Sequence, residues 1–267
     1  MMPRYFDAHS HLNFKQYGAD RDDVIARMQD EGVWTITVGT DTVTSREAVA
    51  LAEGHEHLFA TVGVHPTDWE SGFDADVFRI FAKNKKVVAV GECGLDYYRL
   101  KTGDQRQKTG QEELFESQIQ LALEQDLPLM VHARPSAGTM DAYNDVVDTL
   151  TSYFNTHTSK LRGNVHFFVG DTDIAAKFLD MGFTLSFDGP ITFTREYDEV
   201  VRYVPLDMLL AETDAPFAAP EPYRGKRNEP VYVKEIVRAI ANIRKEDEEE
   251  VRRTLVENTL RVFHITL

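Results

Sequence analysis

The stretch Asp7-Ala8-His9-Ser10-His11 follows a short apolar run, Arg4-Tyr5-Phe6, that is typical of a β-strand. Alternate side chains of an extended strand point to the same face, so His9 and His11 are expected to point in the same direction. Two neutral imidazoles at one end of a strand can bind a single cation. Alternatively, one histidine caps the strand and the other is exposed. This stretch alone does not distinguish the two interpretations, so the remaining motifs of the chain are needed to decide between them.

Short apolar runs alternate with longer amphipathic runs along the sequence. Several of the short runs are almost continuously apolar, as expected of strands that are covered on both faces. The predicted strands are Tyr5–Ala8, Thr35–Gly39, Phe59–Val64, Val87–Gly91, Pro128–His132, Gly163–Phe168, Phe183–Phe187 and Met208–Glu212. The predicted helices, which carry apolar residues at helical spacing, are Asp22–Asp30, Glu112–Gln125, Ala142–Phe154, Thr172–Met181, Tyr232–Ile243 and Glu246–Glu257.

This alternation predicts an α/β protein with a parallel sheet. Eight strands in 267 residues fit a (β/α)8 TIM barrel, formed as a single domain over residues 1–267. A doubly wound open sheet is the alternative. No glycine-rich dinucleotide fingerprint follows the first predicted strand, which argues against the commonest form of that alternative.

Composition excludes several classes of function. The formal net charge of −15 opposes non-specific binding to nucleic acids or anionic membranes. Cys93 is the only cysteine, so neither an intramolecular disulfide nor a cysteine-rich zinc site can form. The sequence contains no run of about 18 apolar residues and no signal-peptide pattern. We therefore expect a cytoplasmic protein that does not associate with membranes, and its oligomeric state is not indicated.

Reactive groups of a TIM barrel gather where its strands end, at the C-terminal face. Most of the predicted strand ends carry a histidine or a carboxylate. These residues are His9, His11, His65, Glu92, His132, His166, Glu212 and Asp214. Chance would not readily place five of the nine histidines of the chain at such positions.

Imidazoles and carboxylates that crowd one barrel mouth are costly to bury without a cation. Mixed nitrogen and oxygen ligands suit zinc or manganese, whereas oxygen-rich sites with water suit magnesium. One carboxylate, such as that of Glu92, can bridge two ions about 3.5–4 Å apart. Four histidines with Glu92 and Asp214 bring only two negative charges, so two divalent ions would leave about two positive charges. Such a centre would attract a phosphodiester.

Seven motifs occur in order from about Phe6 to Phe263. They are His9-Ser10-His11, Gly63-Val64-His65-Pro66, Gly91-Glu92-Cys93-Gly94-Leu95-Asp96-Tyr97-Tyr98, His132-Ala133-Arg134, His166-Phe167-Phe168, Glu212-Thr213-Asp214-Ala215-Pro216 and Arg224-Gly225-Lys226-Arg227-Asn228-Glu229-Pro230. The ordered set resembles the TatD family of metal-dependent deoxyribonucleases. The resemblance implies an amidohydrolase-like TIM barrel, metal-dependent hydrolysis and DNA as the substrate.

The resemblance also implies which side chains bind the metal ions. The ligands of one ion would be His9, His11, Glu92 and Asp214, and those of the other would be Glu92, His132 and His166. The sequence departs from the family at Ala133 and Pro135, where the family often has a polar and an acidic residue. These departures remove no ligand but bear on substrate preference.

The cationic residues near these motifs are candidates for substrate binding. Arg134 is expected to bind a phosphate oxygen, with a salt bridge in the loop as the alternative. Arg224, Lys226 and Arg227 form a small cationic loop that is expected to contact a phosphate backbone, with surface ion pairs as the alternative. His65 is expected to face the substrate or to support a ligand, unless it simply packs beside Pro66.

The expected reaction is metal-assisted hydrolysis, in which an activated water molecule attacks phosphorus. Asp214 is the predicted general base, and Glu92 is also predicted to be essential for catalysis. Within the same motifs, Asp96 is expected to cap a turn, with orientation of a metal ligand as the alternative. Glu212 is expected to support its strand, with a position in the barrel mouth as the alternative.

The first predicted function is DNA hydrolysis, in the form of an exonuclease that acts on single strands. The second is hydrolysis of another ester or amide by the same centre, such as an aminoacyl-tRNA ester or a small phosphoester. The third is a non-catalytic scaffold, which the apparently complete ligand set argues against.

Overall fold

The computed structural model describes residues 2–100, 105–157 and 161–267. Its eight strands form one parallel sheet in the order β1-β2-β3-β4-β5-β6-β7-β8. An isolated parallel bridge between Ser10 and Ala215 links the first strand to the segment after the last one, so the sheet is nearly closed. The fold is therefore the predicted (β/α)8 TIM barrel.

The strands are β1 (Tyr5–Ser10), β2 (Val33–Val38), β3 (Leu58–Val62), β4 (Val87–Asp96), β5 (Leu129–Arg134), β6 (Gly163–Val165), β7 (Thr184–Phe187) and β8 (Leu209–Ala211). The α-helices are α1 (Arg21–Asp30), α2 (Thr42–Glu53), α3 (Ala75–Ala82), α4 (Gln105–Gln125), α5 (Asp141–His157), α6 (Thr172–Asp180), α7 (Asp198–Tyr203), α8 (Val233–Arg244) and α9 (Glu248–Val262). Short 3-10 helices are η1 (Lys15–Tyr17), η2 (Pro66–Ser71), η3 (Gly189–Thr192), η4 (Leu206–Met208) and η5 (Pro230–Tyr232).

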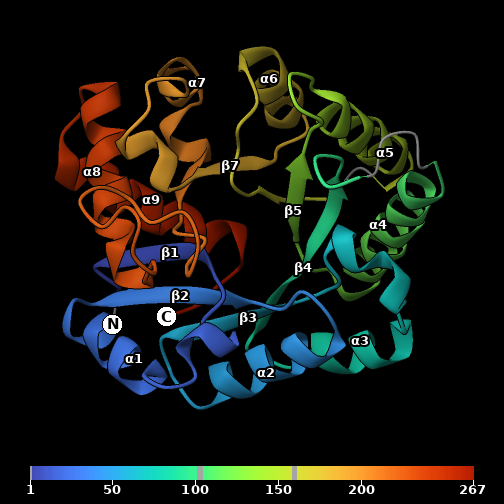
Figure 1. Cartoon of the computed structure of the whole chain (residues 1–267), viewed down its shortest axis with the longest axis horizontal. Coiled ribbons are helices and arrows are strands. Elements are labelled where there is room, and N and C mark those ends of the chain that lie inside the picture. The colour runs from blue at the N-terminus through green and yellow to red at the C-terminus, as the bar shows by residue number, and fades with distance from the viewer. Residues whose placement is uncertain (1, 101–104, 158–160) are drawn as a thin grey trace.

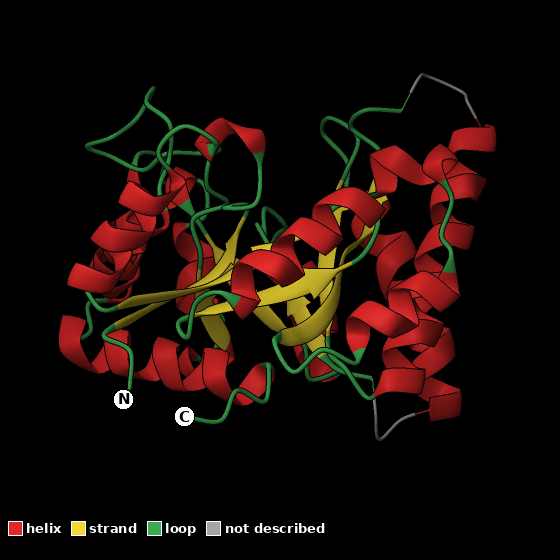
Figure 2. Ribbon diagram, turned by 90° about the horizontal axis from the view of Figure 1, so that it is seen from below, coloured by secondary structure: helices red, strands yellow, loops and turns green. Residues whose placement is uncertain are grey.

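The helices form a ring around the strands, in chain order from α1 to α8 (Figure 1). A view turned by 90° shows the strands enclosed between helices (Figure 2). Strands covered in this way are shielded from water on both faces and are mostly apolar. Accordingly, β1, β4 and β7 are buried along their whole length, and the polar residues of β1 and β4 are buried with them.

The floor of the barrel is closed by α9 and the residues that follow it. Apolar side chains from the strands pack there against apolar side chains from the C-terminal segment. The strand residues are Phe6, Ala8, Ile36, Val38, Val88, Ala89, Met130 and Leu210, and the C-terminal residues are Val256, Val262, Phe263 and Ile265. This packing fills the lower barrel and leaves the opposite end, where the strands terminate, for the polar residues.

All eight predicted strands are confirmed, but β4 is longer than predicted. It continues past Gly91 to Asp96, so Glu92 lies within the strand instead of after it. The prediction stopped at glycine, which usually weakens a strand. Here Gly91 and Gly94 allow β4 to approach β5 closely, since a Cβ on Gly94 would lie 2.0 Å from the carbonyl oxygen of His132.

Three α-helices, α2, α3 and α7, were not predicted, and α4 begins at Gln105 instead of Glu112. Helix α2 is rich in alanine and hydroxyl residues and begins with a capping box formed by Asp41 and Thr44. Helix α7 has only six residues, too few for a helical period to be recognised. Among the described helices, none has the length and apolar character needed to cross a lipid bilayer.

Candidate metal centre

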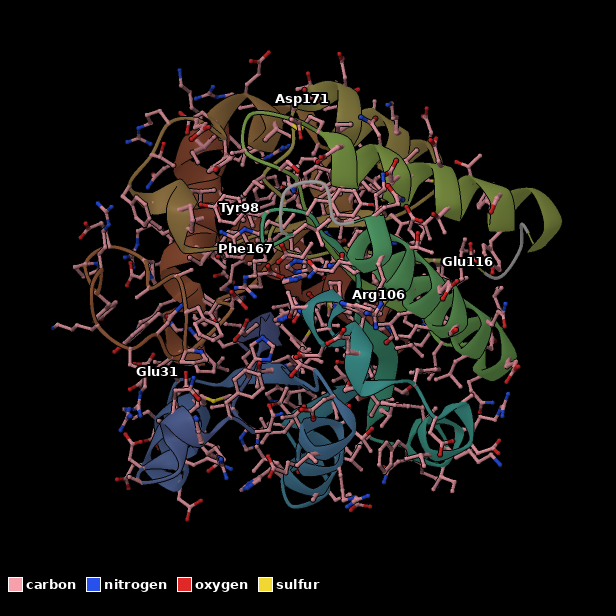
Figure 3. The ribbon with its side chains drawn as sticks, turned by 45° about the vertical axis from the view of Figure 1, so that its right-hand side comes forward. Glu31, Tyr98, Arg106, Glu116, Phe167 and Asp171 are labelled. Atoms are coloured by element: carbon pink, nitrogen blue, oxygen red, sulfur yellow. The ribbon has the colours of Figure 1, made fainter. Side chains whose placement is uncertain are left out.

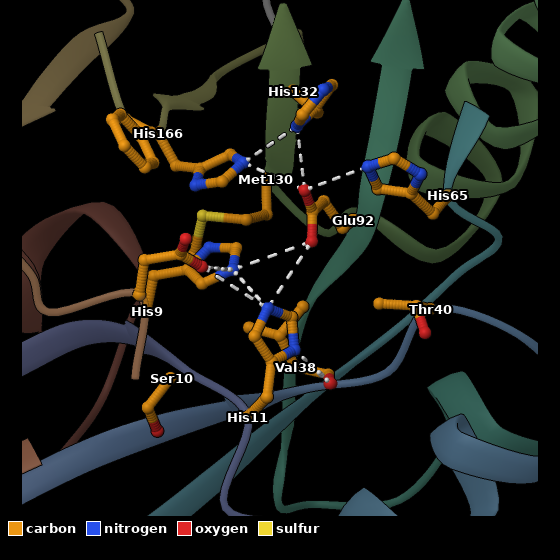
Figure 4. A network of polar contacts seen from close by, with 12 residues as sticks. His9, Ser10, His11, Val38, Thr40, His65, Glu92, Met130, His132 and His166 are labelled. Carbon is orange, nitrogen blue, oxygen red and sulfur yellow. Dashed lines mark hydrogen bonds and ion pairs between the residues drawn. The ribbon is translucent and has the colours of Figure 1, made fainter. Parts of the chain in front are cut away.

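Six side chains predicted to bind metal ions converge at the C-terminal end of the barrel. Five of them, His9, His11, Glu92, His132 and His166, are labelled in Figure 4. Strand β1 contributes His9, and His11 follows it directly. The remaining residues come from β4, β5, the turn after β6 and the segment after β8. They are Glu92, His132, His166 and Asp214. The sequence therefore predicted this convergence correctly from residues up to 205 positions apart (His9 to Asp214).

The first group of donor atoms surrounds one oxygen of Glu92. The Nε2 atoms of His9 and His11 lie 3.2 Å apart, and Glu92 Oε2 lies 3.6 Å from each of them. Asp214 Oδ1 lies 3.7 Å from His9 Nε2 and 3.4 Å from His11 Nε2. Ligands about 2.0–2.2 Å from a tetrahedral ion are spaced about 3.3–3.6 Å from one another. The donor atoms of His9, His11 and Glu92 therefore have spacings that suit a single divalent ion, and Asp214 lies within 3.7 Å of both imidazoles.

The second group surrounds the other oxygen of the same carboxylate. Glu92 Oε1 lies 2.8 Å from His132 Nδ1 and 2.9 Å from His166 Nε2, and these nitrogens are 3.2 Å apart. His65 Nε2 is 3.4 Å from Glu92 Oε1. The two oxygens of Glu92 thus face two separate sets of nitrogen atoms, which is the arrangement of a carboxylate that can bridge two ions.

The electrostatics of the centre favour bound cations. Burial opposes the charge on Glu92, but the imidazoles of His166, His65 and His132 outweigh it and hold the pKa of Glu92 well below its usual range. Burial also opposes a charge on His166, but Glu92 and Glu212 raise its pKa well above the usual value. The carboxylates therefore draw positive charge into a buried site. Divalent ions supply that charge without protonating the imidazoles.

Outer contacts orient three of the four imidazoles predicted as ligands, two through hydrogen bonds and one through a longer ion-pair contact. His11 Nδ1 donates to the carbonyl of Val38 over 3.1 Å, and His132 Nε2 donates to Asp96 Oδ2 over 3.3 Å. Glu212 Oε1 lies 3.5 Å from His166 Nδ1. Such outer contacts orient ligand rings and select their tautomer. Asp96 both accepts the Arg99 amide in the predicted turn and contacts His132, so its two interpretations hold together. Glu212 contacts His166 in addition to its expected structural role.

Three residues at the rim have backbone angles in the left-handed region. These are Phe167, with a φ of 48°, Asp214, with a φ of 51°, and Ala218, with a φ of 49°. The conformation is unfavourable for a bulky side chain, so it must be held by other contacts. Glu212 Oε1 accepts the Phe167 amide over 2.6 Å, and the carbonyl of His9 accepts the Asp214 amide over 3.0 Å. The left-handed conformation thus occurs directly after His166 and at Asp214 itself, where it sets the direction of two side chains predicted to bind metal.

A cavity of about 710 Å³ opens above both groups. Its lining includes many of the residues predicted to act in the site. These are His11, His65, Glu92, His132, Arg134, His166 and Asp214. Figure 3 shows Tyr98 and Phe167 close to this mouth, whereas Glu31, Glu116 and Asp171 lie on the outer ring.

His65 and Arg134, both predicted to contact the substrate, line this cavity. The backbone amide of Thr67 donates to His65 Nδ1 over 3.1 Å, so the Nε2 atom of the same ring is directed at Glu92. The guanidinium carbon of Arg134 lies 4.1 Å from the ring centroid of Tyr98. The salt bridge considered for Arg134 is not found among the described residues.

The cationic loop lies outside the cavity. Arg227 binds Asp20 with a shortest distance of 2.6 Å and also contacts Glu229, so the alternative of a surface ion pair describes this residue. Arg224 stacks over Phe193 at 4.1 Å, and Lys226 is exposed. None of the three predicted loop cations lines the cavity.

Other cavity residues were not predicted from the sequence. Arg99, Phe14, Tyr197 and Phe217 all line the cavity. Each lies on a loop or at the edge of an element, where neither periodicity nor a strand end marks a functional position. The only available signal was proximity, because Arg99 and Phe217 each lie three residues after a motif carboxylate, Asp96 or Asp214.

Comparison with known proteins identifies relatives over the full length of the chain. A family described as TatD related DNase matches residues 6–264. The metal-dependent hydrolase YabD of Bacillus subtilis, described as uncharacterized, is 40% identical over 265 residues, covering 97% of this chain and 99% of that protein. A protein of Pantoea ananatis described as 3'-5' ssDNA/RNA exonuclease TatD is 32% identical, covering 97% of this chain and 98% of that protein. The crystal structure of YJJV, a TatD homologue from Escherichia coli K12, matches with a TM-score of 0.88 and 28% identity over the whole of both chains.

Proposed function

Because the chain belongs to the TatD family of metal-dependent hydrolases, we propose that it hydrolyses phosphodiester bonds of DNA at the centre around Glu92. The observation that carries this proposal is the division of the Glu92 carboxylate between two sets of nitrogen donors, at 3.6 Å on one oxygen and 2.8–2.9 Å on the other. A relative described as an exonuclease acting on single-stranded DNA and RNA supports a nucleic acid as the substrate.

We further propose two divalent ions as cofactors. His9, His11, Glu92 and Asp214 would hold one ion, and Glu92, His132 and His166 would hold the other. When bound, such ions supply Lewis acidity to a phosphoryl oxygen and lower the pKa of a nearby water molecule. The nitrogen-rich donor set favours zinc or manganese over magnesium.

Two carboxylates would have different roles in the reaction. Asp214 lines the cavity with its side chain 11% exposed, so it can accept a proton from a water molecule that attacks phosphorus. Glu92 is more deeply buried and keeps the two sets of imidazoles in register. The cytoplasmic location remains a prediction from the sequence.

The proposal is tested with protein that has been stripped of metal by a chelator and then reloaded with zinc, manganese or magnesium. We expect hydrolysis of single-stranded DNA to require the ion. Duplex DNA, an aminoacyl-tRNA and a small phosphoester complete the substrate panel. Hydrolysis of the aminoacyl ester without hydrolysis of DNA would replace the proposed function with the alternative one.

Asp214→Asn tests the proposed base. The substitution removes the proton acceptor but keeps the size of the side chain, so we expect kcat on DNA to fall about 10²–10⁴-fold. Asp173→Asn, at an exposed position on α6, is the matched control and should leave kcat unchanged. A metal-loaded Asp214→Asn enzyme with full activity would rule out the base assignment.

A further inference from the structure

The two sides of the cavity differ in chemistry. Arg99 and Arg134 lie after or at the end of β4 and β5, whereas Phe14 and Phe217 lie in the loops after β1 and β8. Strands β1 and β8 are neighbours at the closure of the barrel, and β4 and β5 are three or four positions away from each of them in the strand order. The cavity therefore has a cationic wall and, across the barrel, an aromatic wall.

The aromatic wall is built on the proposed ligand His11. Phe14 stacks on the His11 ring with a centroid distance of 4.4 Å and an interplanar angle of 18°. Phe217 stands edge-on to both rings, at 6.1 Å from His11 and 6.4 Å from Phe14. Although it is a large apolar residue, Phe217 is 47% exposed. Such an exposed ring beside a reactive centre provides a flat surface for a ligand.

The exposed Phe217 ring is attached to a rigid turn. The Phe217 amide donates to the carbonyl of Asp214 over 2.8 Å. Asn228 then donates its side-chain amide to the carbonyl of Phe217 over 2.6 Å and its backbone amide to the carbonyl of Pro216 over 3.1 Å. Asn228 is buried, so this residue of the Arg224–Pro230 motif holds the turn that carries Phe217. A fixed aromatic ring stacks a nucleobase with little loss of entropy.

Neither guanidinium group of the cationic wall has a short ion pair among the described residues. Within the described chain no carboxylate pairs with Arg134, whose planar group is supported by the ring of Tyr98 at 4.1 Å. Arg99 is 57% exposed at its side chain and lies 3.8 Å from Asp96 Oδ2, longer than a strong hydrogen bond. Guanidinium groups bind phosphate oxygens through parallel hydrogen bonds.

We propose that the cavity holds a nucleotide chain in one direction, with a base stacked on Phe217 and a phosphate bound by Arg134 and Arg99 on the other side of the cleaved bond. This inference rests on the proposed function and adds the orientation of the substrate. In this proposal, the residues of the two walls determine how the substrate is oriented. These residues are separate from the six side chains that would hold metal.

The base-stacking side is tested with short single-stranded oligonucleotides in which one thymidine is replaced by 5,6-dihydrothymidine. The saturated ring keeps its hydrogen-bonding edge but is not planar, so it stacks poorly. We expect the replacement at one nucleotide beside the cleaved bond to lower kcat/KM about 5–100-fold in the wild-type protein. In Phe217→Ala, thymidine and dihydrothymidine should be cleaved equally, and Phe217→Trp should restore the preference.

The phosphate-binding side is tested by placing a single uncharged methylphosphonate at each linkage near the cleaved bond. Wild-type kcat/KM should fall about 10-fold or more at one linkage, because a charge-assisted contact is lost there. Arg134→Ala should show no further loss at that linkage. Tyr203→Ala on α7 and Arg253→Ala on α9, both at exposed positions, are the matched controls for the two walls and should behave like the wild type.

The possible outcomes separate the inference from the function on which it rests. Absence of hydrolysis of the unmodified oligonucleotide contradicts the proposed function and the inference together. Hydrolysis that responds to neither modification contradicts the inference alone. The same holds if both responses fall on one side of the cleaved bond, because the two walls require them on opposite sides.

Discussion

At the scale of single residues, the charge on each buried group of the candidate metal centre is stabilised by neighbouring groups of opposite charge. Glu92 is almost fully buried and remains ionised because imidazoles surround it on two sides. Burial lowers the pKa of His132, but Asp96 and Glu92 together outweigh this effect and raise it above the usual value. Every group therefore depends on its neighbour for its charge state. This interdependence gives residues that touch no substrate an effect on metal affinity.

Glu212→Gln is the first prediction at this scale. Glu212 accepts the Phe167 amide and the Ser186 hydroxyl, each over 2.6 Å, and its Oε1 atom also faces His166. Glutamine keeps the shape but removes the charge that orients the His166 imidazole, so we expect the affinity for one ion to fall about 10–100-fold. Titration calorimetry with zinc or manganese measures this directly. Glu199→Gln at an exposed position on α7 is the control, and equal affinities in both variants would contradict a positioning role.

His57 gives a second prediction, remote from the metal centre. Burial, with smaller contributions from His55 and Lys86, lowers the pKa of His57 to about 4. Its Nε2 atom is buried without a hydrogen-bond partner among the described residues. Because the pKa is lowered on folding, the unfolded chain binds a proton first. Stability is therefore fully present above about pH 6.5 and is lost as the pH falls towards 4.

Between pH 7.5 and pH 5 this proton should cost the wild-type protein about 2 kcal/mol of unfolding free energy. His57→Gln cannot take up the proton and should lose less stability by about that amount over the same interval. Urea denaturation of both proteins at the two pH values gives the comparison. Parallel losses in the two proteins would show that His57 is not the group responsible.

At the scale of the elements, the closure of the barrel depends on Asp7. This buried side chain of β1 accepts hydrogen bonds from the Thr213 amide at 2.8 Å and the Thr213 hydroxyl at 2.7 Å, beyond β8. It also accepts from the Thr35 hydroxyl of β2 at 3.2 Å and from the amide of His9 at 3.3 Å. One carboxylate thus ties three segments together directly below His9 and Asp214.

Asp7→Ala should lower the free energy of unfolding by about 2–3 kcal/mol, because buried donors on Thr213 lose their acceptor. Thr35→Ala removes only one hydroxyl donor to the same carboxylate and should cost less, about 1 kcal/mol. Urea unfolding of the metal-free proteins measures both changes. A smaller loss in Asp7→Ala than in Thr35→Ala would contradict the closing role of Asp7.

The same elements show why some features were predictable and others were not. Strands such as β2 and β3 were predictable because strands covered on both faces must be apolar. The length of β4 was not, because its glycines have meaning only where β5 approaches them. Arg99 and Phe217 could not be assigned to the cavity, since loop positions depend on tertiary contacts such as those of Asn228.

At the scale of the whole molecule, the acidic surface and the candidate metal centre act in opposite directions on a nucleic acid. The net charge of −15 repels a phosphate backbone at a distance. Two divalent ions together with Arg99 and Arg134 would make the cavity locally cationic. Productive binding is therefore expected only at the mouth of the barrel. The charge distribution thus favours a site that engages a few nucleotides over an extended binding surface.

Metal binding should also stabilise the whole fold, because the proposed ligands come from both ends of the chain and meet only in the closed barrel. An ion that binds only the folded state contributes about 2.7 kcal/mol at 100 times its dissociation constant. For a chain of this length that corresponds to an increase in Tm of about 5–10 °C per ion. We expect zinc or manganese to produce this shift in metal-free protein, and magnesium to produce a smaller one, since nitrogen donors predominate.

Glu92→Gln should lose most of the shift because Glu92 faces both donor sets, whereas Asp173→Asn should retain it. Differential scanning calorimetry makes the comparison, and an equal shift in Glu92→Gln and the wild type would exclude Glu92 as the shared ligand.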